Sequence, residues 1–107
     1  MKKLQARAHE TARNKGWHDK DVSVGESIAL MHSELSEALE AYRESGMAGY
    51  EWKNNSGKPE GVPSELADVV IRIFDFCGKH GINIERVIRE KMDFNDTRPH
   101  RHGGKAL

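Results

Sequence analysis

The chain has 107 residues, the size of one small domain whose core would gain from association with a second copy. Its 17 basic and 17 acidic residues give zero net charge, which argues against a protein that binds nucleic acid through bulk electrostatics. A single cysteine, Cys77, excludes an internal disulfide, and no stretch approaches the roughly 20 apolar residues of a membrane span. Two lysines near the start precede no apolar signal-peptide core. We therefore expect one domain over residues 1–107, in a soluble cytoplasmic protein with no membrane partner.

The first predicted helix covers residues 3–14, which are mostly good helix formers and end at a stop signal around Gly16. Its thin apolar stripe indicates a helix that covers the edge of a core. A polar connector follows, with Trp17 in it. A large aromatic residue in a charged loop often covers a core edge, and the residues alone do not separate this role from a ligand contact.

The strongest helical pattern runs from about Ser23 to Arg43. At 100° per residue, Glu34 lies beside the apolar stripe and Glu37 lies somewhat further out, whereas the other acids of this segment should face water. The spacing of the stripe resembles the seam of a helix bundle. Its members are Ile28, Met31, Leu35, Ala38, Leu39 and Tyr42.

Residues 45–63 form a long irregular connection that is rich in glycine, proline and polar residues. Long loops in compact domains tend to be functional or mobile. Tyr50 and Trp52 lie in this loop, where they predict either a lid over a planar ligand or, with a slight preference, a hydrophobic plug.

A third helix is predicted after Pro63, with Ser64 as its N-cap and Glu65 in its first turn. Apolar residues surround most of its circumference, so it should be central. The remaining polar strip holds Glu65, Asp68, Arg72 and Asp75. Acids on a largely buried helix must be paired, metal-bound or protonated. An ion-pair network centred on Arg72 is the alternative to a metal site, although Arg72 can pair with only part of the strip.

A last helix is predicted from about Ile84 to Asn95, with Asn83 as its cap. The basic tail after it has no apolar periodicity, and no segment has a convincing strand pattern. The expected fold class is therefore all-α. The core stripe expected on this last helix is Ile84, Val87, Ile88 and Met92.

Two pairs of acids stand out: Glu34 with Glu37, and Glu65 with Asp68, each spaced i, i+3 on a helix face. Four such carboxylates would repel one another unless a cation lay between them. Carboxylate oxygens without His or Cys favour Mg²⁺, with Mn²⁺ as a substitute, and Mg²⁺ usually serves phosphate chemistry. The residues alone thus predict an all-helical magnesium enzyme acting on a phosphorylated small molecule.

Other sites are less well supported by the sequence. Cys77 and His80 are spaced i, i+3, but two ligands make a weak case for zinc. The Glu-x-x-His pairs of a di-iron bundle are missing, and so are a P-loop and a dinucleotide fingerprint.

The pattern Glu34-x-x-Glu37, a variable loop, then Glu65-x-x-Asp68 resembles the MazG-like all-α nucleoside triphosphate pyrophosphohydrolases. The resemblance extends from the Asn14–Trp17 segment to the tail. It implies a four-to-five-helix MazG-like bundle completed by homo-oligomerisation into a dimer or tetramer. It also implies Mg²⁺-dependent cleavage of a nucleoside triphosphate to the monophosphate and pyrophosphate, as nucleotide-pool house-cleaning.

Position by position, the resemblance assigns roles to several residues. Glu34, Glu37, Glu65 and Asp68 match the metal-binding acids, and Glu37, with Glu34 beside it, is the candidate catalytic base. The candidate substrate contacts are Trp17 against the base, Lys91 and Asn95 near the end of the last helix, and Arg98 and Lys105 by charge.

Two readings from other classes compete with the enzyme. One is a non-catalytic helical oligomer that binds nucleotides or a protein partner, in which the acids are ion pairs. The other is a nucleic-acid binder that uses the basic tail; the zero net charge counts against it, so no stable nucleic-acid binding is expected.

Overall fold

The computed structural model describes residues 1–47 and 57–99, and in those ranges the chain forms four helices and no strand. The all-α class is therefore confirmed for the described residues, and each helix lies within a few residues of its predicted position. The helices are α1 (Lys2–Asn14), α2 (Val24–Ser45), α3 (Val62–Lys79) and α4 (Ile84–Asp96).

Two of the helices have an N-terminal side-chain cap. The hydroxyl of Ser23 accepts a hydrogen bond from the Glu26 N–H at the start of α2, and the predicted cap Asn83 accepts one from the Arg86 N–H in α4. The predicted Ser64 cap is wrong, because α3 begins earlier, at Val62, with Gly61 as its N-cap. Proline is well tolerated in a first turn, where its missing N–H costs nothing, so Pro63 lies inside the helix instead of before it.

Glycines in the left-handed region end α1 and α3 in the same way. Gly16 has a φ of 82° and Gly81 a φ of 68°. The next N–H reaches back over the last turn, from Trp17 to the Ala12 carbonyl (3.0 Å) and from Ile82 to the Cys77 carbonyl (2.8 Å). Both are Schellman motifs, and they fix the direction in which the chain leaves each helix.

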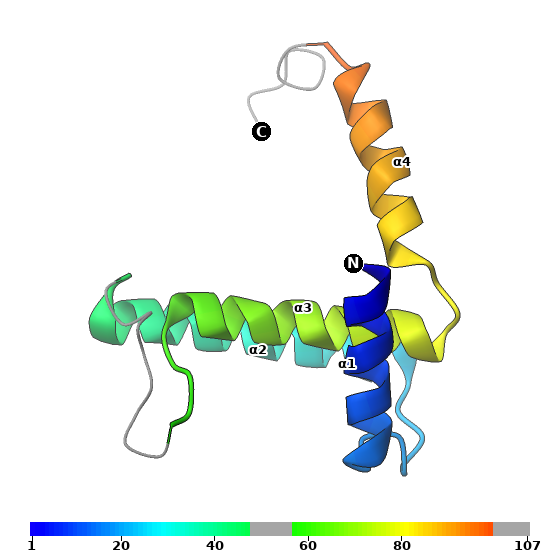
Figure 1. Cartoon of the computed structure of the whole chain (residues 1–107). Helices are drawn as coiled ribbons and strands as arrows, with labels where there is room; N and C mark the ends of the chain where they lie inside the picture. Colours follow the sequence, from blue (N-terminus) through cyan, green and yellow to red (C-terminus); the bar gives the residue numbers. More distant parts are fainter. Residues whose placement is uncertain (48–56, 100–107) are drawn as a thin grey trace.

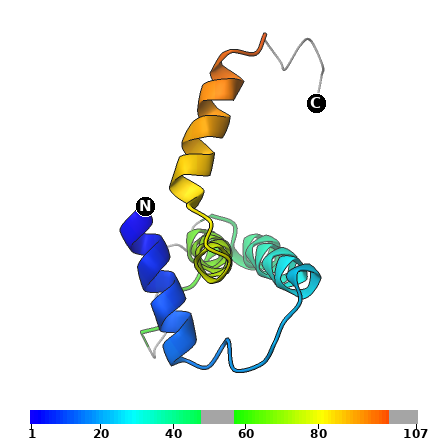
Figure 2. The same ribbon diagram turned by 90° about the vertical axis from the view of Figure 1, so that its right-hand side faces the viewer.

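Helix α3 is the centre of the packed part of the molecule, as its apolar circumference predicted. Helix α2 lies alongside it and α1 crosses it on another side (Figures 1 and 2). The chain direction reverses between α2 and α3, so their acid pairs can face each other. In the described ranges, the buried apolar residues are Ala12, Ala38, Phe74 and Cys77.

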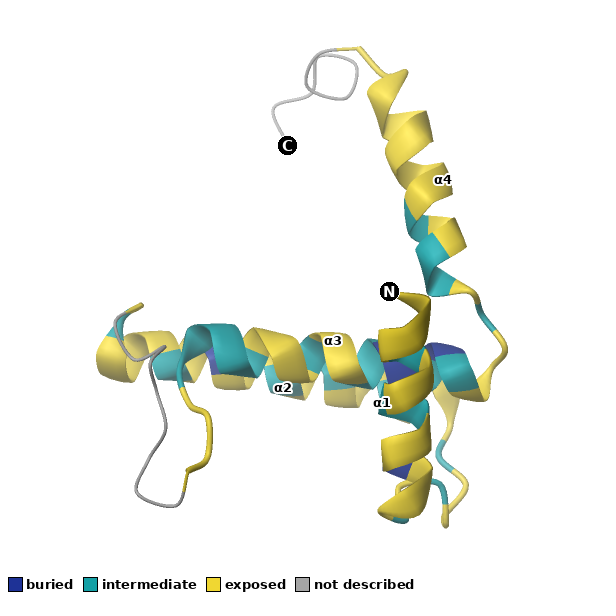
Figure 3. Ribbon diagram, viewed as in Figure 1, coloured by how far each residue is buried: buried dark blue, intermediate teal, exposed yellow. Residues whose placement is uncertain are grey.

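Much of the apolar surface is not covered within one chain (Figure 3). In the predicted stripe of α2 only Ala38 is buried, while Leu35 is 50 % and Tyr42 56 % exposed. No residue of α4 is buried, so the predicted core stripe of that helix is wrong for the single chain. The reason is that α4 runs away from the other helices after Gly81 (Figure 1). Among the described residues, no helix is both long and apolar enough to cross a bilayer.

Candidate functional site

The two acid pairs predicted from the sequence face each other where α2 and α3 lie side by side. Glu34, Glu65 and Asp68 each offer a carboxylate oxygen, and these oxygens all lie within 4.8 Å of one another. We call these three residues the acidic cluster. The i, i+3 spacing in α3 places Glu65 and Asp68 on one face, and α2 supplies Glu34 from across the interface.

Glu37, the fourth predicted metal ligand, lies next to the acidic cluster but outside it. Its side chain is exposed, and its charge is close enough to raise the pKa of Glu65. Glu37 and Glu65 also line a common groove of about 290 Å³. The structure thus brings three of the four predicted acids together and places Glu37 at the rim.

The electrostatics of the acidic cluster show excess negative charge. Burial is the largest cause that raises the pKa of Glu65, followed by the charges of Asp68, Glu37 and Glu34. Burial also raises the pKa of Asp68 most, followed by Glu34, whereas Lys58, Arg72 and a hydrogen bond with Glu65 lower it. The two cations therefore do not offset burial and like-charge repulsion.

Arg72 connects the acidic cluster to Trp17. Its Nε donates to Oε1 of Glu34 at 2.8 Å, and its guanidinium carbon lies 4.9 Å from the centre of the Trp17 ring. Trp17 is 45 % exposed and lines, with Arg72, a cavity of about 230 Å³ between the connector, α2 and α3. The candidate base-stacking residue therefore lies one side chain away from the acids.

Among the described residues, the other predicted substrate contacts do not lie at the acidic cluster. Lys91 and Asn95 are exposed in the second half of α4, and Arg98 is exposed just after the helix ends. Lys91 and Arg98 both lie over the Phe94 ring, at 5.8 and 5.7 Å from its centre. Tyr50, Trp52 and Lys105 lie outside the described residues.

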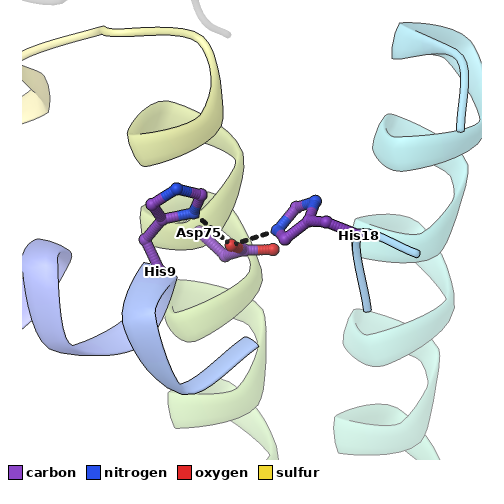
Figure 4. Close-up of side chains that lie close together, drawn as sticks. All are labelled: His9, His18 and Asp75. Carbon is purple, nitrogen blue, oxygen red and sulfur yellow. Dashed lines mark hydrogen bonds and ion pairs between the residues drawn. The ribbon is translucent and has the colours of Figure 1, made fainter. Parts of the chain in front are cut away.

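A second polar cluster, which the sequence did not reveal, lies further along α3 (Figure 4). Oδ1 of the buried Asp75 lies 2.9 Å from Nδ1 of His9 in α1 and 2.8 Å from Nε2 of His18 in the connector. The two imidazole rings meet edge to face at 5.3 Å. We call these three residues the histidine cluster. The only signal in the sequence was an acid on a buried helix, because its partners are 57 and 66 residues away.

Cys77 and His80 do not form a site together. Cys77 is buried, which raises the pKa of its thiol, and the exposed His80 ring packs on Phe76 at 4.4 Å. Over residues 1–47 and 57–99, the groups with metal-ligand geometry are the acidic cluster and the histidine cluster.

In comparisons with known proteins, no family model, no curated protein and no solved structure matches the chain. The MazG-like resemblance therefore rests on the residues of this sequence, and the activity that it implies is a proposal.

Proposed function

We propose that this protein is a Mg²⁺-dependent nucleoside triphosphate pyrophosphohydrolase of MazG-like type. The observation that carries the proposal is the convergence of Glu34, Glu65 and Asp68 from two helices onto a space of one coordination sphere. Three carboxylates from rigid helices, with no histidine or thiol among them, are the donor set that suits Mg²⁺ or Mn²⁺.

The pKa directions favour a cation site over a set of ion pairs. In an ion pair the partner cation lowers the pKa of a carboxyl group below its ordinary value. Glu65 and Asp68 instead have raised pKa values, so their charged forms are under-compensated by the protein. The non-catalytic alternative explains the contact of Glu34 with Arg72, but it does not explain why the acids of α3 lie against Glu34.

In the proposed hydrolysis, each of the following residues would have a separate role. Glu34, Glu65 and Asp68 would hold the ion, and Arg72 fixes the orientation of Glu34 through its Nε–H. Glu37, exposed at the rim, would accept a proton from an attacking water. A bound Mg²⁺ would neutralise charge on the triphosphate oxygens.

Trp17 would provide the flat surface for the nucleobase. It lines a cavity together with Arg72, which also contacts Glu34, so a nucleotide whose phosphates lie at Glu34 could direct its base toward the indole ring. Arg72 lies between the two positions and can support both.

Assembly into a homodimer or tetramer is part of the same proposal. The exposed stripe of α2 borders a groove of about 470 Å³ lined by residues that include Leu35, Leu39 and Tyr42. A second copy placed there would bury apolar surface that one chain leaves in water. Light scattering at micromolar concentration tests this directly: a folded monomer would contradict the assembly.

The activity is tested with a panel of ribo- and deoxyribonucleoside triphosphates, with Mg²⁺ and with chelator. We expect pyrophosphate and the monophosphate as products, only with the metal. Release of inorganic phosphate alone, or no turnover of any nucleotide, would contradict the proposal.

A further inference from the structure

We propose that His9, His18 and Asp75 form a second metal site, selective for Zn²⁺ and similar transition-metal ions and separate from the acidic cluster. The proposal does not depend on the pyrophosphohydrolase activity. It rests on three ligand atoms from three segments that all lie within 4.8 Å of one another.

The donor set is the first reason. Two imidazole nitrogens and one carboxylate oxygen form a combination that zinc and other first-row transition metals prefer, whereas Mg²⁺ prefers oxygen alone. Arg72 and Lys79 line the cavity beside His18 and Asp75. Their positive charges repel any cation. Mg²⁺, which binds mainly through charge, would therefore bind weakly here, whereas a transition-metal ion also gains from its bonds to the imidazole nitrogens.

The distances are the second reason. Zinc lies about 2.0–2.2 Å from nitrogen and oxygen ligands and prefers a tetrahedron, so two of its ligands are roughly 3.4 Å apart, about half an ångström more than a hydrogen bond holds the same atoms. The nitrogens of His9 and His18 lie 2.9 and 2.8 Å from the Asp75 oxygen. Without an ion, an N–H of each ring can donate to that oxygen. Binding would need the neutral rings to turn a lone pair inward, with the proton on the other ring nitrogen.

The fold holds these side chains in place. A Cβ at position 78 would lie 2.6 Å from Cβ of His9, so Gly78 is what lets α1 approach α3 closely enough for His9 to reach Asp75. His18 follows directly after the Schellman turn at Gly16. The side chains are largely shielded, with exposed fractions of 24 % for His9, 22 % for His18 and 10 % for Asp75.

The site has access to solvent and room for further ligands. His18 and Asp75 line the cavity of about 230 Å³, and His9 lines a separate hollow of about 370 Å³ beside Gly78. An ion held by three protein ligands keeps positions for water. Because its ligands come from α1, the connector and α3, its binding would tie these segments together and stabilise the packed part of the chain.

The test is calorimetric titration of the untagged full chain with Zn²⁺ in excess Mg²⁺, which would occupy the acidic cluster. Visible absorption of Co²⁺, displaced by Zn²⁺, reports nitrogen ligation. The variants are His9→Gln and His18→Gln, with the exposed His32→Gln of α2 as matched control and Asp68→Asn as control for the acidic cluster. Circular dichroism without metal checks the fold; His18 lies in the connector, so its replacement leaves every helix sequence intact.

We expect one Zn²⁺ per chain and a higher Tm with Zn²⁺ in the wild type, in His32→Gln and in Asp68→Asn. Residues that only support a metal ligand contribute about 10–100-fold in affinity, so loss of a ligand in His18→Gln should weaken binding at least about 100-fold. The proposal is overturned if the wild type binds no Zn²⁺ in excess Mg²⁺, or if the folded His18→Gln variant binds it as the wild type does.

Discussion

Carboxyl groups are partly or fully removed from water at both ends of the polar strip on α3, but their surroundings differ. At its first turns, Glu65 and Asp68 face a third acid, and burial with like-charge repulsion raises their pKa values. About two turns after Asp68, Asp75 is more deeply buried, yet its oxygen contacts two imidazole nitrogens from elsewhere in the fold. The carboxylate at one end has hydrogen-bond partners from other parts of the fold, whereas the two carboxyl groups at the other end have raised pKa values. This contrast distinguishes a carboxylate that has partners within the fold from the two candidate Mg²⁺ ligands of α3.

Arg72 lies between the two ends and belongs to both. It donates to Glu34 on one side and packs over Trp17, which borders the cavity of the histidine cluster, on the other. Of the predicted ion-pair network centred on Arg72, the structure shows a salt bridge to one acid, Glu34, while the charge of Arg72 also lowers the pKa of Asp68. Substitutions of Glu65, Asp68 and Asp75 therefore test the contrast between the two ends of the strip.

The largest effect is expected for Asp68→Asn. Loss of one carboxylate from the acidic cluster should lower kcat on the order of 10³-fold, comparable to loss of a preorganised electrostatic group. Tm measured in chelator should stay the same or rise, because the change relieves repulsion with Glu34. The exposed Asp21→Asn is the control; steady-state pyrophosphate release and a thermal melt give both values. Near-normal turnover in Asp68→Asn would place the metal elsewhere.

Trp17→Ala should raise KM roughly tenfold to a hundredfold, because base–aromatic stacking contributes about 1–3 kcal/mol. Stacking is similar in the ground and transition states, so kcat should change less. Kinetics of the preferred nucleotide measure both. An unchanged KM together with a lower Tm would make Trp17 a core plug, and Tyr50 and Trp52 would be the next residues to test.

Asp75→Asn should lower the free energy of unfolding by about 1–3 kcal/mol, since a neutral amide oxygen accepts the two histidine hydrogen bonds more weakly than a carboxylate oxygen does. Urea unfolding without metal, beside Asp68→Asn, measures the contrast between the two ends of the strip. If Asp75→Asn left the free energy of unfolding unchanged and Asp68→Asn lowered it strongly, Asp68 and not Asp75 would be the carboxylate that stabilises the fold.

The predictions that succeeded are those that depend on residues close together in the sequence. Helix positions, the Asn83 cap and the Gly16 stop depend on neighbours in the chain, and these predictions agree with the structure. The convergence of Glu34 with Glu65 and Asp68 followed from two helix faces and a reversal between them. The Ser64 cap failed because Pro63 fits inside a first turn as well as before it.

The rest depended on packing between distant segments. No spacing relates His9, His18 and Asp75, which only the crossing of α1 over α3 and the turn at Gly16 bring together. The apolar stripe of α4 is a regular helical pattern, but no neighbouring residue predicts what covers it, and nothing in the described part of the chain buries it. Lys91, Asn95 and Arg98 lie away from the acidic cluster for the same reason, because the sequence near α4 does not determine where that helix packs.

The smallest expected effect is the pH dependence of Glu65→Gln in chelator. The folded-state pKa of Glu65 is raised above its ordinary 4.5, so its protonated form is the more stabilising one. That stability is present below the ordinary pKa and is lost as pH rises through the raised value. Gln mimics the protonated acid, so it should raise Tm slightly at pH 7 and not at acid pH. The rise should be a few degrees at most, since 1 kcal/mol corresponds to roughly 4–8 °C in a small domain. An equal rise at both pH values would argue against the electrostatic cause.

The most direct test of the acidic cluster is calorimetric titration of Mg²⁺ at pH 7 into the wild type, Asp68→Asn and His18→Gln. Mg²⁺ held by Glu34, Glu65 and Asp68 should bind to the wild type and to His18→Gln alike. It should bind at least about tenfold more weakly to Asp68→Asn, since even supporting residues of a metal site contribute that much. Equal binding by Asp68→Asn and the wild type, or weaker binding by His18→Gln alone, would contradict a magnesium site between α2 and α3.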